Sequence, residues 1–256
     1  MISMGQRVLV TGSSGNLGTS ICDFLLRDGY SVVGLDKAQP HRSTQEEAAL
    51  PAHDATRGSW KFIECDLGDP ARVEEVLAGA HSEGPFDVVV NNAGVIYNSP
   101  LLRFESGQLS VHDVGAWALV LSGTLSSAFY VSAHCARKMV ASGRQGTIIN
   151  ISSICAAGNV GQAAYSAAKA GVNAMTASLS KELGPLGIRV AAIAPGFFDT
   201  ESTRRALSKD ALSRIKKAIP LQKLGEPGQL HHAIRFIIDN GYFHGKVLEL
   251  DGGLTL

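Results

Sequence analysis

A tyrosine and a lysine four residues apart are the side chains of this sequence best suited to acid–base chemistry. Tyr165 and Lys169 lie in a segment rich in Ala, Ser and Gly that predicts a helix over residues 163–183, so both project from one helix face. An ammonium group beside a phenol favours the phenolate, and we expect it to lower the pKa of Tyr165 from about 10 toward neutrality. A tyrosine tuned in this way exchanges a proton with a substrate oxygen.

The same spacing occurs a second time, in Tyr242 and Lys246. That segment contains Gly245 and runs into a predicted strand over residues 246–250, so its side chains have no helical reason to converge. We assign this second pair to structure and keep Tyr165 as the candidate acid–base residue.

The residues that precede Tyr165 strengthen its candidacy. A predicted buried strand over residues 147–151 is followed directly by Ser152 and Ser153. In a parallel sheet, ligands bind beyond the carboxyl ends of the strands. A serine there can donate a hydrogen bond to a carbonyl oxygen beside the tyrosine hydroxyl, whereas two serines without such context indicate a simple turn.

A glycine-rich segment follows the first predicted strand. The strand covers residues 7–11, the segment 11–18 reads TGSSGNLG, and a helix is predicted over residues 17–28. Glycines permit a tight turn and a close approach of the backbone to a pyrophosphate, and the helix N-terminus adds oriented N–H groups. A glycine-rich turn alone is a weak signal, but its place in a strand–helix unit favours dinucleotide binding.

Asp36 ends the second predicted strand, 18 residues after Gly18. A carboxylate there accepts hydrogen bonds from the adenosine ribose and repels a 2′-phosphate, so the sequence favours NAD(H) over NADP(H). Lys37 weakens the preference for NAD(H). The alternative is that Asp36 only caps the end of the strand.

The composition excludes several classes of protein. The 256 residues fit a single α/β domain over residues 1–256, and Lys plus Arg equals Asp plus Glu at 23 each. Such a balance, with basic residues scattered, predicts no nucleic-acid partner and no membrane partner. The four cysteines form no C-x-x-C pair, no apolar run reaches 18 residues, and a strand begins almost at once. We therefore expect a soluble, cytoplasmic protein.

Strand-like and helix-like segments alternate along the chain. Further strands are predicted at 31–35, 61–65, 86–90 and 188–194, and further helices begin at Pro70 and Pro227. Continuous apolar strands that alternate with helices indicate a doubly wound parallel sheet of about seven strands, Rossmann-like, with helices on both faces. Residues 37–60 are expected to form a long polar connection.

Taken in order, these motifs resemble those of the short-chain dehydrogenase/reductase family, in its compact single-domain branch. The resemblance covers nearly the whole chain. It rests on Asp36 and on the segments 11–18 (TGSSGNLG), 65–67 (CDL), 91–94 (NNAG), 150–153 (NISS), 165–169 (YSAAK), 195–200 (PGFFDT) and 245–253.

The resemblance implies a role for each of these residues. Tyr165 is the implied acid–base residue, Ser153 the carbonyl anchor, and Lys169 the residue that tunes Tyr165 and contacts the nicotinamide ribose. The remaining implied cofactor contacts are Gly12, Ser14, Asn16, Leu17 and Gly18 at the pyrophosphate, Asp36 at the adenosine ribose, Asp66 and Leu67 at the adenine, Asn92, Ala93 and Gly94 at the ribose, and Pro195, Gly196, Phe198 and Thr200 at the nicotinamide end.

Three features depart from the family pattern. The middle glycine of the loop comes one place early, at Gly15, with Asn16 where a glycine is usual. Thr124 occupies the position of a catalytic Asn, so its part in a proton relay behind Lys169 is open. The serine-to-tyrosine gap is one residue short, which leaves Ser152 as the alternative to Ser153.

The leading interpretation is an oxidoreductase that interconverts a secondary alcohol and a ketone with NAD(H), through Ser153, Tyr165, Lys169 and Thr124. The glycine spacing suggests a sugar-nucleotide epimerase or dehydratase instead, but too few residues follow residue 194 for a separate substrate domain. Thr124 motivates a second alternative, a non-catalytic dinucleotide-binding regulator.

Two further expectations concern metals and assembly. The eight histidines are dispersed or adjacent on one helix, which predicts no metal site. The small residues of the helix 163–183 and the apolar segment 114–131 suit helix pairing across a two-fold axis, so we expect a homodimer or homotetramer.

Overall fold

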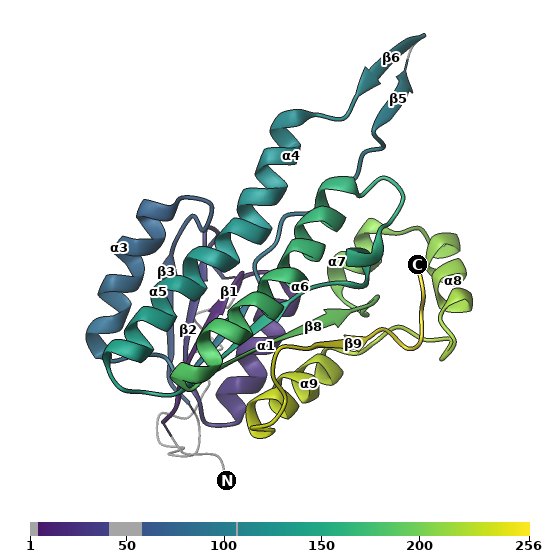
Figure 1. The fold of residues 1–256 in the computed structure, drawn as a ribbon. Helices are drawn as coiled ribbons and strands as arrows, with labels where there is room; N and C mark the ends of the chain where they lie inside the picture. Colours follow the sequence, from purple (N-terminus) through teal and green to yellow (C-terminus); the bar gives the residue numbers. More distant parts are fainter. Residues whose placement is uncertain (1–4, 41–57, 106) are drawn as a thin grey trace.

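A seven-stranded parallel sheet, in the order β3-β2-β1-β4-β7-β8-β9, forms the centre of the chain (Figure 1). The computed structural model describes residues 5–40, 58–105 and 107–256. The strands of this sheet are β1 (Arg7–Thr11), β2 (Ser31–Asp36), β3 (Trp60–Glu64), β4 (Val88–Asn91), β7 (Gly146–Ile151), β8 (Ile188–Pro195) and β9 (Val247–Leu250). This order confirms the predicted doubly wound α/β fold.

Helices cover both faces of the sheet. On one face lie α1 (Asn16–Arg27) and α9 (Pro227–Asp239), and on the other lie α3 (Pro70–Ala80), α5 (Ser127–Ala141) and α6 (Ala163–Leu183). Because side chains alternate along a strand, Val8 and Val10 pack toward the first pair of helices and Leu9 packs toward the other three. Two covered faces explain why the strands read as continuous apolar runs.

Local signals place the helix starts where the sequence predicts them. Asp69 accepts hydrogen bonds from two backbone N–H groups at the start of α3, and Pro70 takes the first helical position. At α9, Pro227 follows Glu226, which forms a reciprocal capping box with Gln229. Both helices therefore begin at the predicted residues.

A buried chain of polar side chains links the strands that carry the site to the helices beside them. Asn91 on β4 donates to Asn150 on β7 (2.8 Å) and to Ser132 on α5 (2.9 Å). Asn150 in turn donates to Thr176 on α6 (2.8 Å). Hydrogen bonds of this kind are strong in a dry interior, so they fix the position of α6 against the ends of β4 and β7.

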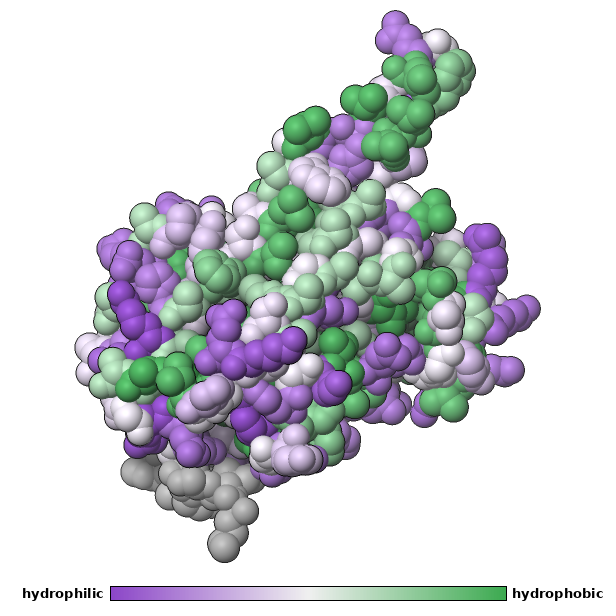
Figure 2. Space-filling view, in the orientation of Figure 1, coloured by the Kyte–Doolittle hydropathy of each residue, from purple (hydrophilic) through white to green (hydrophobic). Residues whose placement is uncertain are grey.

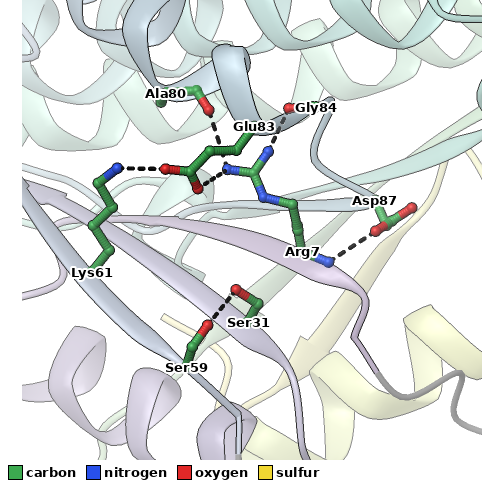
Figure 3. A network of polar contacts seen from close by, with 8 residues as sticks. All are labelled: Arg7, Ser31, Ser59, Lys61, Ala80, Glu83, Gly84 and Asp87. Carbon is green, nitrogen blue, oxygen red and sulfur yellow. Dashed lines mark hydrogen bonds and ion pairs between the residues drawn. The ribbon is translucent and has the colours of Figure 1, made fainter.

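A second polar network lies at the amino ends of the strands, opposite the site (Figure 3). The guanidinium of Arg7, the first residue of β1, donates to the carbonyls of Ala80 and Gly84 and to Glu83. Lys61 on β3 also contacts Glu83 (2.7 Å), while the backbone N–H of Arg7 donates to Asp87 (2.8 Å). These contacts tie the end of α3 to the sheet edge.

Several elements were not predicted. A two-stranded hairpin, β5 (Leu102–Glu105) and β6 (Gln108–Val111), projects from the body of the chain (Figure 1), and two short helices, α7 (Glu201–Ala206) and α8 (Lys209–Ala218), follow β8. Of the long connection expected at 37–60, residues 41–57 lie outside the described residues.

One helical run, Val114–Ala141, is long and apolar enough to cross a membrane when judged by length and composition alone. It comprises α4 (Val114–Leu121), a π-helical turn (Ser122–Ser126) and α5. Its Val131, Cys135 and Met139 are fully buried in the core beneath α3 and α6. A helix of the covering layer in such a fold meets the same criterion.

Candidate active site

A cleft of about 610 Å³ opens at the carboxyl ends of the strands, where β1, β2, β3, β4 and β8 end. Most of the implied cofactor contacts line it: Gly12, Asn16, Leu17, Gly18, Asp36, Asp66, Leu67, Asn92, Ala93, Gly94, Gly196, Phe198 and Thr200. Ser14, Tyr165, Lys169 and Pro195 are not among the lining residues. Ser14 is half-buried beside the cleft, and Pro195 is buried at the end of β8, where it pairs with Leu250.

The glycine loop brings α1 against β1. Gly12 has a left-handed backbone (φ +65°), and a Cβ on Gly18 would lie 1.9 Å from the Gly12 carbonyl oxygen. Only glycine at position 18 therefore lets the first turn of α1 pack on the loop. Gly15, the early middle glycine, is the residue before α1, and its N–H donates to the Gly12 carbonyl (3.2 Å).

The N-terminus of α1 faces the cleft without a side-chain cap, unlike α3, α4, α7 and α8. The first N–H groups of a helix have no partner within the helix, and they carry the positive end of its dipole. Asn16 and Leu17 at this end line the cleft. The arrangement is suited to an anion such as a pyrophosphate.

The Asp36 carboxylate lies at one end of the cleft and supports the glycine loop. One oxygen accepts the N–H of Ser14 (3.0 Å) and the other accepts the N–H of Ala38 (3.2 Å). These bonds fix the carboxylate where it can accept hydrogen bonds from hydroxyl groups and repel a phosphate. Lys37 lines the same cleft.

Thr11 and Asn92 join the loops that follow β1 and β4. The Thr11 hydroxyl accepts the N–H groups of Asn92 and Ala93 (3.1 Å each). The Asn92 amide donates to the carbonyls of Thr11 and Gly12 (3.1 Å each). Asn92 therefore lines the cleft and also holds the glycine loop in place. The role of Thr11 was missed because it depends on a partner 81 residues away in the sequence.

Tyr165, Lys169 and Ser153 meet beyond the carboxyl end of β7. The Lys169 amine is buried, donates to the carbonyl of Ile151 (2.6 Å) and lies 5.6 Å from the centre of the Tyr165 ring. The side chain of Ser153 lies within hydrogen-bonding reach of the Tyr165 hydroxyl, and its oxygen accepts the N–H of Cys155 (3.1 Å). The structure therefore brings the three side chains together next to Gly94 of the cleft, where a Cβ would lie 3.6 Å from the Lys169 amine.

Ser152 and Ser153 differ in what they contact. The Ser152 hydroxyl is buried and donates to the backbone carbonyl of Lys169 (3.3 Å). Ser153 is the serine whose side chain reaches the Tyr165 hydroxyl. This geometry favours Ser153 as the carbonyl anchor, despite the short gap in the sequence.

The expected lowering of the Tyr165 pKa is wrong for the chain as described. Burial raises the pKa of Tyr165 to about 12, the nearby Cys155 adds to the rise, and the bond with Ser153 opposes it. Burial also lowers the pKa of Lys169 to about 8. A lysine that is itself desolvated and directed at a carbonyl oxygen does not offset the desolvation of the phenol.

Thr124 lies in the π-helical turn between α4 and α5. Its hydroxyl accepts the N–H of Val95 (2.9 Å) and donates to the Val95 carbonyl (3.4 Å), so both of its hydrogen-bonding functions engage the loop after β4. A Cβ on Gly94 would lie 3.7 Å from this hydroxyl. Thr124 therefore fixes the loop beside Lys169.

Several residues that line the cleft were not among the predicted cofactor contacts. They come from α4 and the π-helical turn, from α7, and from residues adjacent to predicted ones: Leu119, Ser122, Gly123, Val95, Phe197, Ser202, Thr203, Gly15, Lys37, Cys65, Gly68 and Asp69. One signal was available for α7, because Thr200 caps this helix by accepting the N–H of Thr203 (3.2 Å). Helix α4 is capped in the same way, because Asp113 accepts the N–H of Ala116 (3.0 Å).

The described residues contain no group of three or more His, Cys, Asp or Glu side chains that could bind a metal ion. His231 contacts Asp28 (2.9 Å) and stacks on Phe24, so it connects α9 to α1.

A nucleotide-sized cleft at the carboxyl ends of a doubly wound parallel sheet, flanked by serine, tyrosine and lysine side chains, defines a dinucleotide-dependent oxidoreductase. Comparison with known proteins agrees: the sequence profile of the short chain dehydrogenase family matches residues 6–211, and the chain belongs to this family of nicotinamide-dependent oxidoreductases.

Relatives of this family align with the chain over nearly their whole length. The 3-oxoacyl-(acyl-carrier-protein) reductases FabG of Salmonella typhimurium and Escherichia coli are each 34% identical over 256 residues, which is 98% of either chain. Nodulation protein G of Azospirillum brasilense is 34% identical over 259 residues, covering 98% of this chain and 99% of its own length.

Proposed function

We propose that this chain interconverts a secondary alcohol and a ketone with NAD(H). The observation that supports the proposal most strongly is the meeting of Ser153, Tyr165 and Lys169 beside the cleft that has Asp36 at its other end. A protein that only bound the dinucleotide would have no chemical need for those three side chains.

The residues present fit a nicotinamide dinucleotide. The uncapped N-terminus of α1 suits the pyrophosphate, and the Asp36 carboxylate suits two ribose hydroxyls but not a 2′-phosphate. Gly94 and Thr200 line the part of the cleft next to Lys169 and α7. When bound, the nicotinamide ring accepts or supplies the hydride, and the protein provides orientation and proton transfer.

Tyr165 moves the proton in this proposal. In ketone reduction its hydroxyl donates to the carbonyl oxygen, a task suited to a phenol whose raised pKa keeps it protonated at neutral pH. Ser153 donates a hydrogen bond to the same oxygen and orients it. Lys169 contacts the ribose hydroxyls and, once charged, stabilises the phenolate that remains.

The names of the relatives suggest where a substrate search should begin. Two of them are named as reductases of 3-oxoacyl groups on an acyl carrier protein, so 3-oxoacyl thioesters are the first ketones to test. Other ketones and secondary alcohols complete the panel.

The test is the change in NADH and NADPH absorbance with purified protein and this panel. We expect turnover of at least one ketone with a higher kcat/KM for NADH than for NADPH. Asp36→Ala should lower the ratio of kcat/KM for NADH to kcat/KM for NADPH. Lys37→Ala should raise this ratio, because Lys37 attracts the 2′-phosphate that Asp36 repels. NADH binding without turnover of any substrate would favour a dinucleotide-binding regulator, and a wild-type preference for NADPH would overturn the cofactor assignment.

A further inference from the structure

The hairpin of β5 and β6, which we call the arm, has one apolar and one polar face. Leu102 pairs with Val111 and Phe104 pairs with Leu109, so these four side chains share one face. The opposite face carries Arg103, Gln108 and Ser110, since successive side chains alternate across a strand.

The apolar face is open to solvent, and of the polar face only Gln108 is shown as exposed. The four apolar side chains are between 53% and 75% exposed, whereas Arg103 and Ser110 are half-buried. In the described part of the chain, β5 and β6 pair only with each other (Figure 1). A two-stranded hairpin is at best marginally stable alone in water, so a contact that covers its apolar face would stabilise it.

The base of the arm is firmly attached to the body. The N–H of Ser99 donates to the carbonyl of Gly161 (2.7 Å) in the loop before α6, and the side chains of Gln162 and Asn98 are hydrogen-bonded (2.7 Å). The N–H of His112 closes the base by donating to the carbonyl of Leu101 (2.8 Å). The arm therefore has a defined direction and is positioned in advance for a partner.

The apolar surface is large enough for a stable contact between proteins. Hydrophobic residues gather along the arm (Figure 2). The exposed side chains of Leu101 and Val114 add apolar surface between the arm and α4. If a fully exposed side chain of this kind offers about 150 Å², and each of the six is between 53% and 75% exposed, together they offer on the order of 600 Å². A standard interface buries roughly 800 Å² per partner, a value that the exposed Trp117 of α4 helps to reach.

The charge of the arm favours a protein partner over a membrane. Arg103 is the one Lys or Arg between residues 99 and 113, and it belongs to the polar face. Segments that lie on membranes combine an apolar face with several basic side chains. The apolar face itself is uncharged, so two identical faces meet without repulsion, as a two-fold contact requires.

We propose that the arm is an interface with a second copy of this chain, in which the apolar faces of two arms pack against each other across a two-fold axis. The proposal does not depend on the enzymatic activity. The surface between α5 and α6, on which helix pairing was expected, is a separate one.

The test compares neighbouring substitutions on opposite faces of β6. Leu109→Asp places a charge in the apolar face and should halve the mass measured by light scattering at micromolar concentration. Gln108→Asp places the same charge on the polar face and should leave the mass of the wild type unchanged. An unchanged mass for Leu109→Asp, or a monomeric wild type, would overturn the proposal.

A second variant guards against misfolding. Replacement of residues 102–111 by a Gly-Ser-Gly linker removes the arm and leaves the seven-stranded sheet intact. We expect a folded protein, by circular dichroism, with half the wild-type mass; the full mass would contradict the proposal. Sedimentation of the wild type, but not of Leu109→Asp, with phosphatidylcholine vesicles would instead identify a lipid partner and would also overturn it.

Discussion

Lys169 is an amine in the interior of the chain, where its proton is difficult to accommodate. Its Nζ has the carbonyl of Ile151 as a hydrogen-bond acceptor, and burial lowers its pKa from 10.5 to about 8. A difference of this size corresponds to on the order of 3 kcal/mol against the charged form in the native state. Lys169 therefore weakens the fold, a cost that its proposed role in the reaction would explain.

Lys169→Met should raise the free energy of unfolding near neutral pH by about 1–3 kcal/mol, because it removes a buried charge while keeping the volume. Lys181→Met, an exposed position on the same helix, should change it little. Chemical denaturation of both variants and the wild type measures the effect. Turnover should fall in Lys169→Met, since the site loses its ammonium group.

The pH dependence gives this prediction a sign. Below about pH 8 the Lys169 amine is protonated in both the native and the unfolded wild type, so the native state carries the full free-energy cost of the buried charge. Between about 8 and 10.5 the native state releases the proton first, so wild-type stability rises with pH. The advantage of Lys169→Met should shrink over that interval, and an advantage that grew with pH would contradict the assignment.

Residue types could be predicted from the sequence more reliably than their surroundings. The spacing of Tyr165 and Lys169 on one helix was visible, and both side chains do reach the same site. Their pKa values were not predictable, because burial of each group depends on β7 and on the loop at Cys155. The same limit applied to Ser152 and Ser153, which only the direction of their side chains distinguishes.

At the scale of elements, the π-helical turn directs Thr124 toward the loop after β4. A π-turn inserts an extra residue into a helix and often occurs at functional sites. Here it follows α4 and brings the Thr124 hydroxyl to both backbone groups of Val95. The loop that contains Gly94 is thereby fixed beside Lys169.

Thr124→Val keeps the shape of the side chain and removes both hydrogen bonds. We expect it to lower the free energy of unfolding by about 1–3 kcal/mol and to weaken NADH binding, because a buried N–H and a carbonyl lose their partner. Thr124→Ser should retain most of the wild-type stability and most of the NADH affinity. Denaturation and calorimetric titration measure the two effects. Equal binding by Thr124→Val and the wild type would show that this loop does not position the cofactor.

The elements that could be predicted are those that bury an apolar face. The helix at 163–183 and the starts at Pro70 and Pro227 are of this kind. The arm was not predicted, although its residues alternate, since alternation normally indicates a strand covered by its own chain. Helix α8 was missed because it has no buried residue.

For the whole molecule, the groove between α5 and α6 is the second surface suited to a copy of the chain. Its volume is about 530 Å³, and Phe129, Val140 and Leu186 on its rim are between 43% and 52% exposed. Apolar helices that expose such side chains are stabilised by pairing across a two-fold axis. If the arm and this groove each join two copies of the chain, the assembly would be a tetramer.

Val140→Asp should therefore lower the mass in solution, whereas Val160→Asp, at an exposed apolar residue outside the groove, should not. Analytical ultracentrifugation at micromolar concentration measures both. A variant with both Val140→Asp and Leu109→Asp should be a monomer. If Val140→Asp sedimented like the wild type, the groove would not join subunits.

The central claim is that Tyr165 transfers the proton between the substrate oxygen and the protein. The most direct test is the turnover of Tyr165→Phe on a verified ketone, with NADH binding measured alongside. Because the ring is kept and the hydroxyl lost, we expect turnover to fall about 10²–10⁴-fold while NADH still binds. Tyr242→Phe, at the fully exposed tyrosine of the second pair, should turn over like the wild type. Full activity of Tyr165→Phe would contradict the mechanism.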